Sequence, residues 1–208
     1  MKLYYSPTSP YVRKVMVCAI ERGLKDRIQL EKTDGFGESH RAANPLAKVP
    51  ALEPDEGAPA LFDSLVICDH LDRIGDAPRL IPDGAKDGGK ARDGTLRRHA
   101  IGQGMTDAAL LMQVQRVRNQ RLEHPIPDDW WMERQREAIR ASVDRMELEI
   151  DELSAAFELG AISVATALGY LDFRFPDFGW RDQAPHLAEW FKQIAERPSM
   201  AETAPPES

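Results

Sequence analysis

The sequence predicts an α/β domain over residues 1–78, followed by an all-helical domain over residues 86–200. In residues 1–75, short strand-like segments alternate with helix-like ones, whereas no strand pattern recurs beyond residue 95. Between these parts, residues 76–94 are rich in Pro, Gly and Asp and poor in apolar side chains, which is typical of a linker. A chain of 208 residues is long enough for two such domains, each with its own core.

The α/β domain opens with a strand and a helix joined by a turn rich in serine and proline. Residues 2–5 form the strand, and Pro10 stands in the first turn of the helix, where proline is tolerated. Gly23 supplies the left-handed backbone position that commonly ends a helix. The apolar residues between them recur every three or four positions and predict the buried face: Val12, Val15, Met16, Ala19 and Ile20.

The remaining elements of this domain are shorter. We expect a second strand at 27–31, a turn at 35–37, one or two helical turns at 38–43, two short strands at 49–53 and 60–62, and a helix that begins at Asp63-Ser64. The strand–helix–strand opening favours parallel pairing and predicts an open sheet.

The second domain is predicted to contain helices only. A long helix from Leu96 to about Leu122 ends before Pro125 and Pro127, and Asp128 or Asp129 begins the next, which continues to Leu153. Two shorter helices follow at 162–173 and 185–194. We expect the tail from Pro198, which contains three prolines, to fray or to lie across the surface.

Composition excludes several classes of function. The net charge of −7 argues against nucleic acid or an anionic membrane as the main partner, because either requires a basic surface. The longest uncharged run of the second half, residues 159–171, is shorter than the roughly 20 residues of a spanning helix. Two cysteines, Cys18 and Cys68, are too few for a disulfide framework, so we expect a reducing, cytoplasmic location.

No histidine or cysteine spacing predicts a metal site, and neither a nucleophile elbow nor a phosphate-binding glycine loop occurs. Three loop features remain, and the first is Ser9 at the strand-to-helix turn. Its hydroxyl either caps the helix or donates a hydrogen bond to a bound thiolate, which the positive end of the helix dipole also favours.

The other two features lie at residues 44–50 and at Asp63-Ser64. Residues 44–50 form either a plain rigid turn or a cis Val49–Pro50 bond that presents the Val49 backbone to a peptide-like ligand. Asp63 and Ser64 either cap a helix, or Ser64 binds a carboxylate while Asp63 attracts an ammonium group. Together the three features predict a site for a small zwitterionic peptide.

These residues, in this order, resemble the cytosolic glutathione transferases, specifically a bacterial serine-type member. The resemblance rests on residues 9–13, on residues 44–50, on Asp63-Ser64 and on residues 169–174, and it covers essentially residues 1–200. It implies a thioredoxin-like N-terminal domain with a cis-proline, an all-helical C-terminal domain, glutathione as co-substrate, no metal and a homodimer.

The resemblance also assigns roles to individual residues. Ser9 would stabilise the glutathione thiolate, with Ser6 as the rival hydroxyl. Val49, beside Pro50, would pair with the cysteinyl part of glutathione through its backbone, and Asp63 and Ser64 would hold the γ-glutamyl end. Many members place a cation for the glycine carboxylate in the loop at 33–37; this chain has none there, so Lys32 or Lys48 would take that role.

The expected reaction joins the thiolate to a small hydrophobic electrophile. Lowering a thiol pKa of about 8.5 by about two units requires roughly 2.7 kcal/mol, which one hydrogen bond to sulfur and a helix N-terminus can supply. The alternatives are another glutathione-dependent reaction (isomerisation, dehalogenation or peroxide reduction) and a glutathione-binding protein without turnover. Ser9 cannot form a mixed disulfide, which disfavours thiol exchange.

Two expectations concern the helical domain. The electrophile pocket would draw on Tyr11, Met105 and Met112, with Leu111 and Trp131 as further candidates, although most such residues belong to the core. Family members usually begin the core helix of this domain with a capping box. Residues 158–161 lack one here, so the helix start should be weak or shifted to Ser163.

Overall fold

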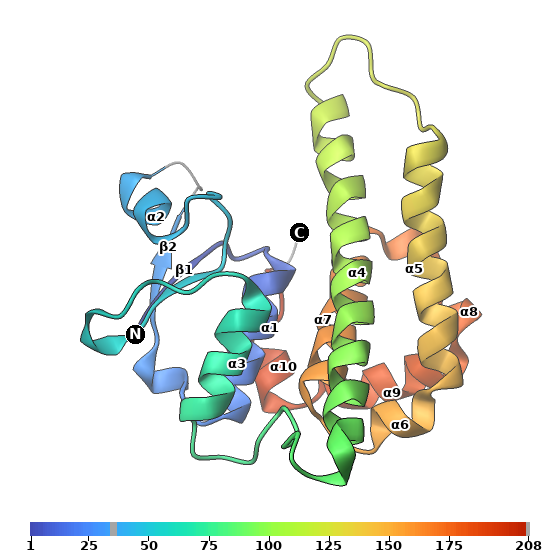
Figure 1. Ribbon diagram of the computed structural model, residues 1–208. Coiled ribbons are helices and arrows are strands. Elements are labelled where there is room, and N and C mark those ends of the chain that lie inside the picture. Colours follow the sequence, from blue (N-terminus) through green and yellow to red (C-terminus); the bar gives the residue numbers. More distant parts are fainter. Residues whose placement is uncertain (34–36, 207–208) are drawn as a thin grey trace. The chain divides into compact units, whose positions relative to one another are not determined.

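The computed structural model describes residues 1–33 and 37–206, so the expected turn at 35–37 lies largely outside the described residues. The chain divides into two compact units. The first comprises residues 1–95 together with the chain from residue 197 on, and the second comprises residues 96–196. The first unit combines a small sheet with helices, and the described residues of the second form helices and the loops that join them (Figure 1).

The sheet of the first unit has the strand order β2-β1-β3, formed by Gln29–Lys32, Lys2–Tyr5 and Ala51–Glu53. β1 runs parallel to β2, with Lys2 opposite Gln29, and antiparallel to β3, with Tyr4 opposite Ala51. The central strand supplies Leu3 and Tyr4 to the core, where both are buried. The expected parallel pairing of the first two strands is confirmed.

The strand expected at 60–62 is wrong, because Leu61 forms only an isolated bridge with Leu52. The two residues exchange both backbone hydrogen bonds, at 2.8 and 2.7 Å. Pro59 has no N–H to extend the ladder on one side, and Asp63 already caps the next helix on the other. The segment is therefore too short for a strand.

Helices α1 (Pro10–Glu21), α2 (Glu38–Ala43) and α3 (Ser64–Ile74) complete the α/β part, with short 3-10 turns η1 (Lys25–Arg27), η2 (Asp55–Gly57) and η3 (Asp87–Gly89). On α1, Val17 and Cys18 are buried, whereas Met16 and Ile20, expected in the core, are partly exposed. The buried face is broader than expected because α1 packs against α3 and also against a C-terminal helix, α10 (Pro198–Glu202).

The C-terminal tail does not fray as expected. It forms α10, whose Ser199 and Met200 are buried. The Arg197 guanidinium pairs with the Glu21 carboxylate at 2.9 Å, and the Ser199 hydroxyl donates to the same carboxylate at 2.5 Å. Arg13 donates to the Met200 carbonyl at 3.1 Å. These contacts with α1 tie down a segment that its prolines alone would leave loose.

A buried ion pair fixes the end of α3. Arg22 and Asp72 are both almost fully buried, and Arg22 Nε lies 3.4 Å from Asp72 Oδ1. Arg22 also donates to the backbone carbonyls of Asp72 and Gly75. The Asp72 carboxylate accepts from Leu80 N at 2.6 Å and from Arg79 Nε at 2.7 Å. The Asp72 carboxylate therefore links Arg22, at the end of α1, to residues 79–80, which follow α3.

The helical unit contains α4 (Lys90–Asn119, in this unit from residue 96), α5 (Trp130–Leu148), α6 (Ile150–Ser154), α7 (Leu159–Arg174), η4 (Pro176–Phe178), α8 (Trp180–Gln183) and α9 (Pro185–Ala195). α4 begins at Lys90 rather than at Leu96, since the Asp87 carboxylate accepts from Ala91 N at 3.1 Å and so extends the helix start. Asp129, not Asp128, caps α5, accepting from the amides of Trp131 and Met132.

α7 is the core helix of this unit and is buried from Leu159 to Leu171. It begins at Leu159, so the shifted start at Ser163 is wrong, and no side chain caps it, as expected. α4 crosses α7 at Gly102, where a Cβ atom would lie 2.5 Å from the Ser163 carbonyl carbon. In the parts of the chain that the structure describes, no helix is both long and apolar enough to cross a membrane.

Candidate functional site

Strand register brings the three candidate loop features to one edge of the sheet. Tyr4 of β1 lies opposite Ala51 of β3, so the turn that follows β1 adjoins Pro50, which precedes β3. Leu61 bridges Leu52 of β3, and Asp63, two residues further on, begins α3 from this part of the sheet. The residues that leave β1, enter β3 and enter α3 therefore share this edge, which we call the loop edge.

Ser9 occupies the N-cap of α1. Its hydroxyl oxygen accepts from Val12 N at 3.3 Å, so the capping role expected of it is present. Its own amide donates to the Ser6 carbonyl at 3.1 Å, which closes the turn and commits the Ser6 backbone to it. A hydroxyl that accepts from the helix still has its proton to donate, so capping and thiolate binding are compatible.

The Val49–Pro50 peptide bond is cis, as expected. The carbonyl before it, of Lys48, accepts from Asn44 Nδ2 at 2.8 Å and lies 3.1 Å from His40 Nε2. Asn44 Oδ1 accepts in turn from Leu46 N at 3.0 Å. Because Asn44 and His40 are both buried, they hold the peptide group that leads into Val49 in one orientation.

Sequence reasoning did not assign His40 and Asn44 to this role. Asn44 carried a usable signal, since an asparagine at a helix end before proline commonly bonds to the backbone two residues on. His40 carried none, because its contact depends on how the loop folds back over α2.

Asp63 and Ser64 begin α3 with different environments. The Asp63 side chain is exposed, and its Oδ1 accepts from Leu65 N at 2.7 Å. Ser64 is only 2% exposed, and its Oγ has no hydrogen-bond partner within residues 1–33 and 37–206. Buried hydroxyls are normally paired, so within the described residues this one keeps its hydrogen-bonding capacity unused.

Two lysines are candidates for an anionic group at the same edge. β2 is parallel to β1 and ends at Lys32, so Lys32 lies at the loop edge, and the exposed Lys48 precedes the cis bond. Residues 34–36 of the loop at 33–37, where the family resemblance led us to expect a cation, lie outside the described residues. Both lysines therefore stay predictions for the glycine carboxylate.

The expected electrophile residues have mixed environments. Tyr11 lies on α1 and is partly buried, whereas Met105 and Met112 are buried on α4 in the other unit. Leu111 and Trp131, the further candidates for this pocket, are each 43% exposed and line a groove between α4 and α5. Of the two methionines, Met112 lines a cavity of the helical unit.

No group of three or more metal-ligating side chains occurs among the residues described. The site features are thus a hydroxyl at one helix start, an unpartnered hydroxyl beside a carboxylate at a second, and an oriented peptide group between them.

Comparison with known proteins shows which family the chain belongs to. Residues 3–79 match the family model of the glutathione S-transferase N-terminal domain, and residues 131–193 match that of the C-terminal domain. A GST-like protein of Escherichia coli K12, uncharacterized YibF, is 32% identical over the whole of both chains. The chain belongs to the glutathione S-transferase family.

Solved glutathione S-transferase structures agree. A family member from Pseudomonas fluorescens Pf-5 with bound glutathione is 41% identical over 99% of both chains, with a TM-score of 0.89. A structure of a member from the same strain, with bound S-(propanoic acid)-glutathione, is 42% identical over 100% of both chains, with a TM-score of 0.83. The thioredoxin-like and all-helical fold class predicted from the sequence is confirmed.

Proposed function

We propose that this protein binds glutathione at the loop edge and conjugates its thiolate to a small hydrophobic electrophile. The observation that carries the proposal is the buried, unpartnered Ser64 hydroxyl, beside an exposed carboxylate and on the same edge as Ser9 and Val49. Glutathione has a carboxylate, an ammonium group, peptide groups and a thiol, which these groups can bind in turn. Bound glutathione in the Pseudomonas fluorescens relative supports this assignment.

Each polar group of glutathione is bound by a nearby group of the protein, because the overall charge of −7 does not attract an anion. In this proposal the Ser64 hydroxyl and the N-terminus of α3 receive the γ-glutamyl carboxylate, and the exposed Asp63 carboxylate receives its ammonium group. The Val49 backbone, oriented by Asn44 and His40, pairs with the cysteinyl peptide groups. Lys32 or Lys48 neutralises the glycine carboxylate.

The chemical step requires a thiolate at neutral pH. The Ser9 hydroxyl donates to the sulfur, and this hydrogen bond to a charged atom contributes about 1.5–3 kcal/mol. The first turn of α1 adds about 0.3–1 kcal/mol through its dipole. Together they lower the pKa of the glutathione thiol by about two units. The proton of the glutathione thiol passes to water, and the thiolate sulfur forms the new bond to carbon. In a substitution the leaving group of the electrophile departs with its bonding electrons, and in an addition the resulting carbanion takes a proton from water.

Conjugation is favoured over the other glutathione-dependent reactions by one observation. The ligand in the second Pseudomonas fluorescens structure is a thioether of glutathione, which is the kind of product that conjugation forms. Serine at position 9, rather than cysteine, also disfavours reactions through a mixed disulfide.

The test compares Ser9→Ala with Ser6→Ala in a conjugation assay against a panel of electrophiles, across pH. Ser9→Ala should lower kcat/KM at neutral pH by about ten- to a hundredfold and move the thiolate-dependent limb of the pH profile up by one to two units. Ser6→Ala should leave the profile in place. An unmoved profile for Ser9→Ala removes Ser9 from the mechanism. Calorimetric binding of glutathione, without turnover of any electrophile by the wild type, leaves a binding protein.

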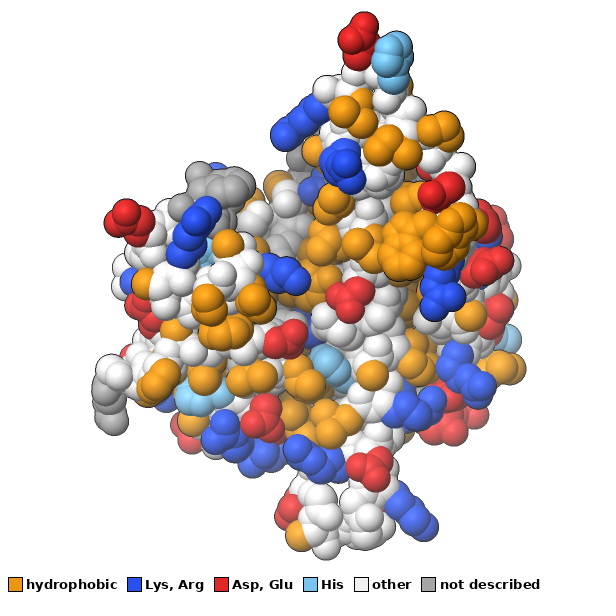
Figure 2. All heavy atoms as spheres, turned by 45° about the horizontal axis from the view of Figure 1, so that its top comes forward, with side chains coloured by type: hydrophobic (Ala, Val, Ile, Leu, Met, Phe, Trp, Pro, Cys, Tyr) orange, Lys and Arg blue, Asp and Glu red, His pale blue; other side chains and the backbone are white. Residues whose placement is uncertain are grey.

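We also propose a homodimer that uses the groove between α4 and α5. This groove, of about 560 Å³, is lined by Leu111 and Trp131, and the Trp131 ring contacts that of Trp130, which is 73% exposed. Figure 2 shows apolar side chains gathered in one orange patch over this part of the helical unit. Apolar patches with exposed tryptophan mark protein interfaces. Trp130→Arg should convert the dimer to monomer in sedimentation experiments.

The proposed compartment is the reducing cytoplasm. Cys18 and Cys68 are both buried free thiols on α1 and α3. Burial raises the pKa of the Cys18 thiol well above its usual value, so it stays protonated and unreactive.

A further inference from the structure

The turn that leads into the cis Val49–Pro50 bond is held by two buried side chains. His40 is 1% exposed and Asn44 is 2% exposed. Their Nε2 and Nδ2 atoms lie 3.1 and 2.8 Å from a single acceptor, the carbonyl oxygen of Lys48. Because a carbonyl oxygen only accepts, the His40 ring carries a proton on Nε2 and donates it. Both lone pairs of the Lys48 oxygen are therefore used within the protein.

Fixing this carbonyl also fixes the direction of the Val49 N–H. The two groups belong to one planar peptide unit, which is trans, so they point in opposite directions. The Val49 side chain packs against the cluster of Tyr4, Ala43 and Ala51, which anchors the same residue a second time. Among the described residues, the Val49 N–H has no acceptor. The protein thus aims one unused backbone donor and holds it in place.

The backbone of the turn does not favour this conformation by itself. Ala47 has a φ of +52°, in the left-handed region that a Cβ atom disfavours. The Ala47 amide donates to the Asn44 carbonyl at 2.9 Å, and Asn44 Oδ1 accepts from Leu46 N at 3.0 Å, so Asn44 closes the turn from within. His40 lies on α2, outside the turn, and adds a restraint from a separate element.

Packing alone does not account for an imidazole at position 40. The His40 ring lies against that of Tyr4, with the ring centres 5.5 Å apart, and a phenyl group would fill the same space. His40 Nδ1 is buried without a hydrogen-bond partner in residues 1–33 and 37–206, a cost in free energy that a phenyl group would not have. Within this part of the chain, the imidazole gains over a phenyl group through its Nε2–H bond to Lys48.

We infer that His40 is a positioning residue for glutathione: through the Lys48 carbonyl it aims the Val49 N–H at the cysteinyl carbonyl oxygen of the ligand. The inference rests on the proposed function and deepens it, because it adds a residue that acts on the ligand only through another. His40 thereby affects the binding of glutathione and not the ionisation of its thiol, which the proposed mechanism assigns to Ser9.

The test is His40→Phe, which keeps a ring and removes the donor, measured by calorimetry with glutathione and by conjugation kinetics. The dissociation constant and the KM for glutathione should both rise about three- to tenfold, as expected for one lost hydrogen bond. The kcat at saturating glutathione and the pH profile should stay in place. The melting temperature should not fall, because the substitution also removes the unpartnered nitrogen.

His70→Phe is the matched control. It makes the same substitution on α3 of the same unit, where His70 is partly exposed and forms no hydrogen bond with the turn in the part of the chain that the structure describes. It should leave the affinity for glutathione unchanged.

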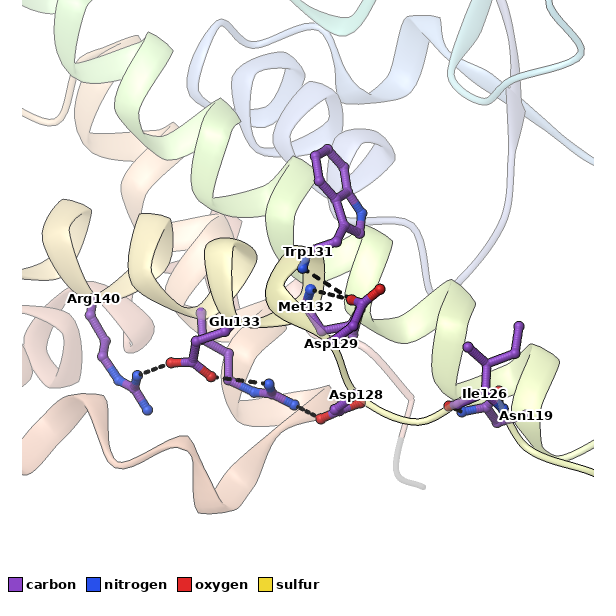
Figure 3. Close-up of polar contacts among 9 residues, drawn as sticks. Asn119, Ile126, Asp128, Asp129, Trp131, Met132, Glu133 and Arg140 are labelled. Carbon is purple, nitrogen blue, oxygen red and sulfur yellow. Dashed lines mark hydrogen bonds and ion pairs between the residues drawn. The ribbon is translucent and has the colours of Figure 1, made fainter.

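A second pair of variants tests the hold on the turn if His40→Phe does not fold. Asn119, at the end of α4, makes the same kind of contact as Asn44: its Nδ2 donates to the Ile126 carbonyl at 2.8 Å, and its Oδ1 accepts from Ile126 N at 3.1 Å (Figure 3). Asn44→Ala should raise the dissociation constant for glutathione at least about tenfold. Asn119→Ala removes the same two kinds of bond in the helical unit and should leave it unchanged.

The outcomes separate this inference from the proposed function. Unchanged affinity in His40→Phe, an equal loss in His70→Phe, or a lower kcat with an unchanged KM overturns the inference and leaves the proposed function in place. Equal losses in Asn44→Ala and Asn119→Ala do the same. A wild type that binds no glutathione at millimolar concentration refutes the proposed function, and the inference with it.

Discussion

Replacing Ser64 by alanine should stabilise the ligand-free protein while weakening its binding of glutathione. Ser64 is 2% exposed, and its Oγ has no partner in the described part of the chain. An unsatisfied buried hydroxyl costs about 1–3 kcal/mol, and Ser64→Ala removes this cost by deleting one atom. At the lower end of that range, the melting temperature should rise by about 2–4 °C for a chain of this size.

The effect on glutathione should have the opposite sign. In the proposed complex the Ser64 hydroxyl donates to the γ-glutamyl carboxylate, and such a charge-assisted bond is worth about 1.5–3 kcal/mol. Its loss corresponds to a dissociation constant about ten- to 150-fold higher. The ligand site thus retains a group that destabilises the empty protein, which is common where function requires a particular donor.

Ser163→Ala provides the matched control. Ser163 is 1% exposed on α7 in the other unit, and its Oγ also has no partner in the described residues. Ser163→Ala should raise the melting temperature in the same direction, with about 0.5 kcal/mol more from helix propensity, and leave glutathione affinity unchanged. The assays are thermal unfolding without ligand and calorimetry with glutathione. A lower melting temperature for Ser64→Ala, or an unaltered dissociation constant, would refute the reasoning.

Three further predictions concern stability. Asp72→Ala leaves the Arg22 charge buried without its carboxylate and should lower the unfolding free energy by about 3–5 kcal/mol in urea, whereas Asp69→Ala, which breaks only the exposed pair with Arg73, should cost less than about 1 kcal/mol. Burial alone would raise the pKa of Glu147, but N–H donors from Leu187 and His186 at the start of α9 outweigh it and hold the pKa below its ordinary value of 4.5. The stabilisation by Glu147 is therefore complete above the pKa of this group in the unfolded state, and it is lost as the pH falls through the lower pKa in the folded state. Between about pH 5 and pH 3, the melting temperature of a Glu147→Gln variant should therefore decrease less than that of the wild type. Because no side chain caps α7, the amides of residues 160 and 161 should exchange faster than amides 166–170 in hydrogen-exchange mass spectrometry, and equal protection of the two groups would contradict a weak helix start.

Local signals made most of the α/β unit predictable. Pro10, Gly23 and Asp63 stand at helix ends, and each acts on the backbone within a few residues of itself. The helices at 10–21 and 64–74 were therefore placed nearly to the residue. The error at Leu61 arose because three apolar residues look like a strand, whereas the proline before them and the cap after them leave room for one bridge.

The features that could not be predicted from the sequence depend on contacts between residues far apart in the chain. The candidate residues of the proposed site could be identified from the sequence, since helix starts and proline turns are local features. The burial of the Ser64 hydroxyl and the hold of His40 on the Lys48 carbonyl could not, because they depend on packing and on the path of a loop. The roles of Ser9, Val49 and Ser64 in glutathione binding stay predictions.

Helix α10 has a consequence for how the protein is made. It belongs to the first unit and packs on α1, yet it is synthesised after all of residues 96–196. At about 5–20 residues per second, the ribosome takes roughly 5–20 s to make that intervening stretch. Throughout this time the nascent α1 lacks the cover that Ser199 and Met200 later provide. The first unit to emerge is thus the last to be completed.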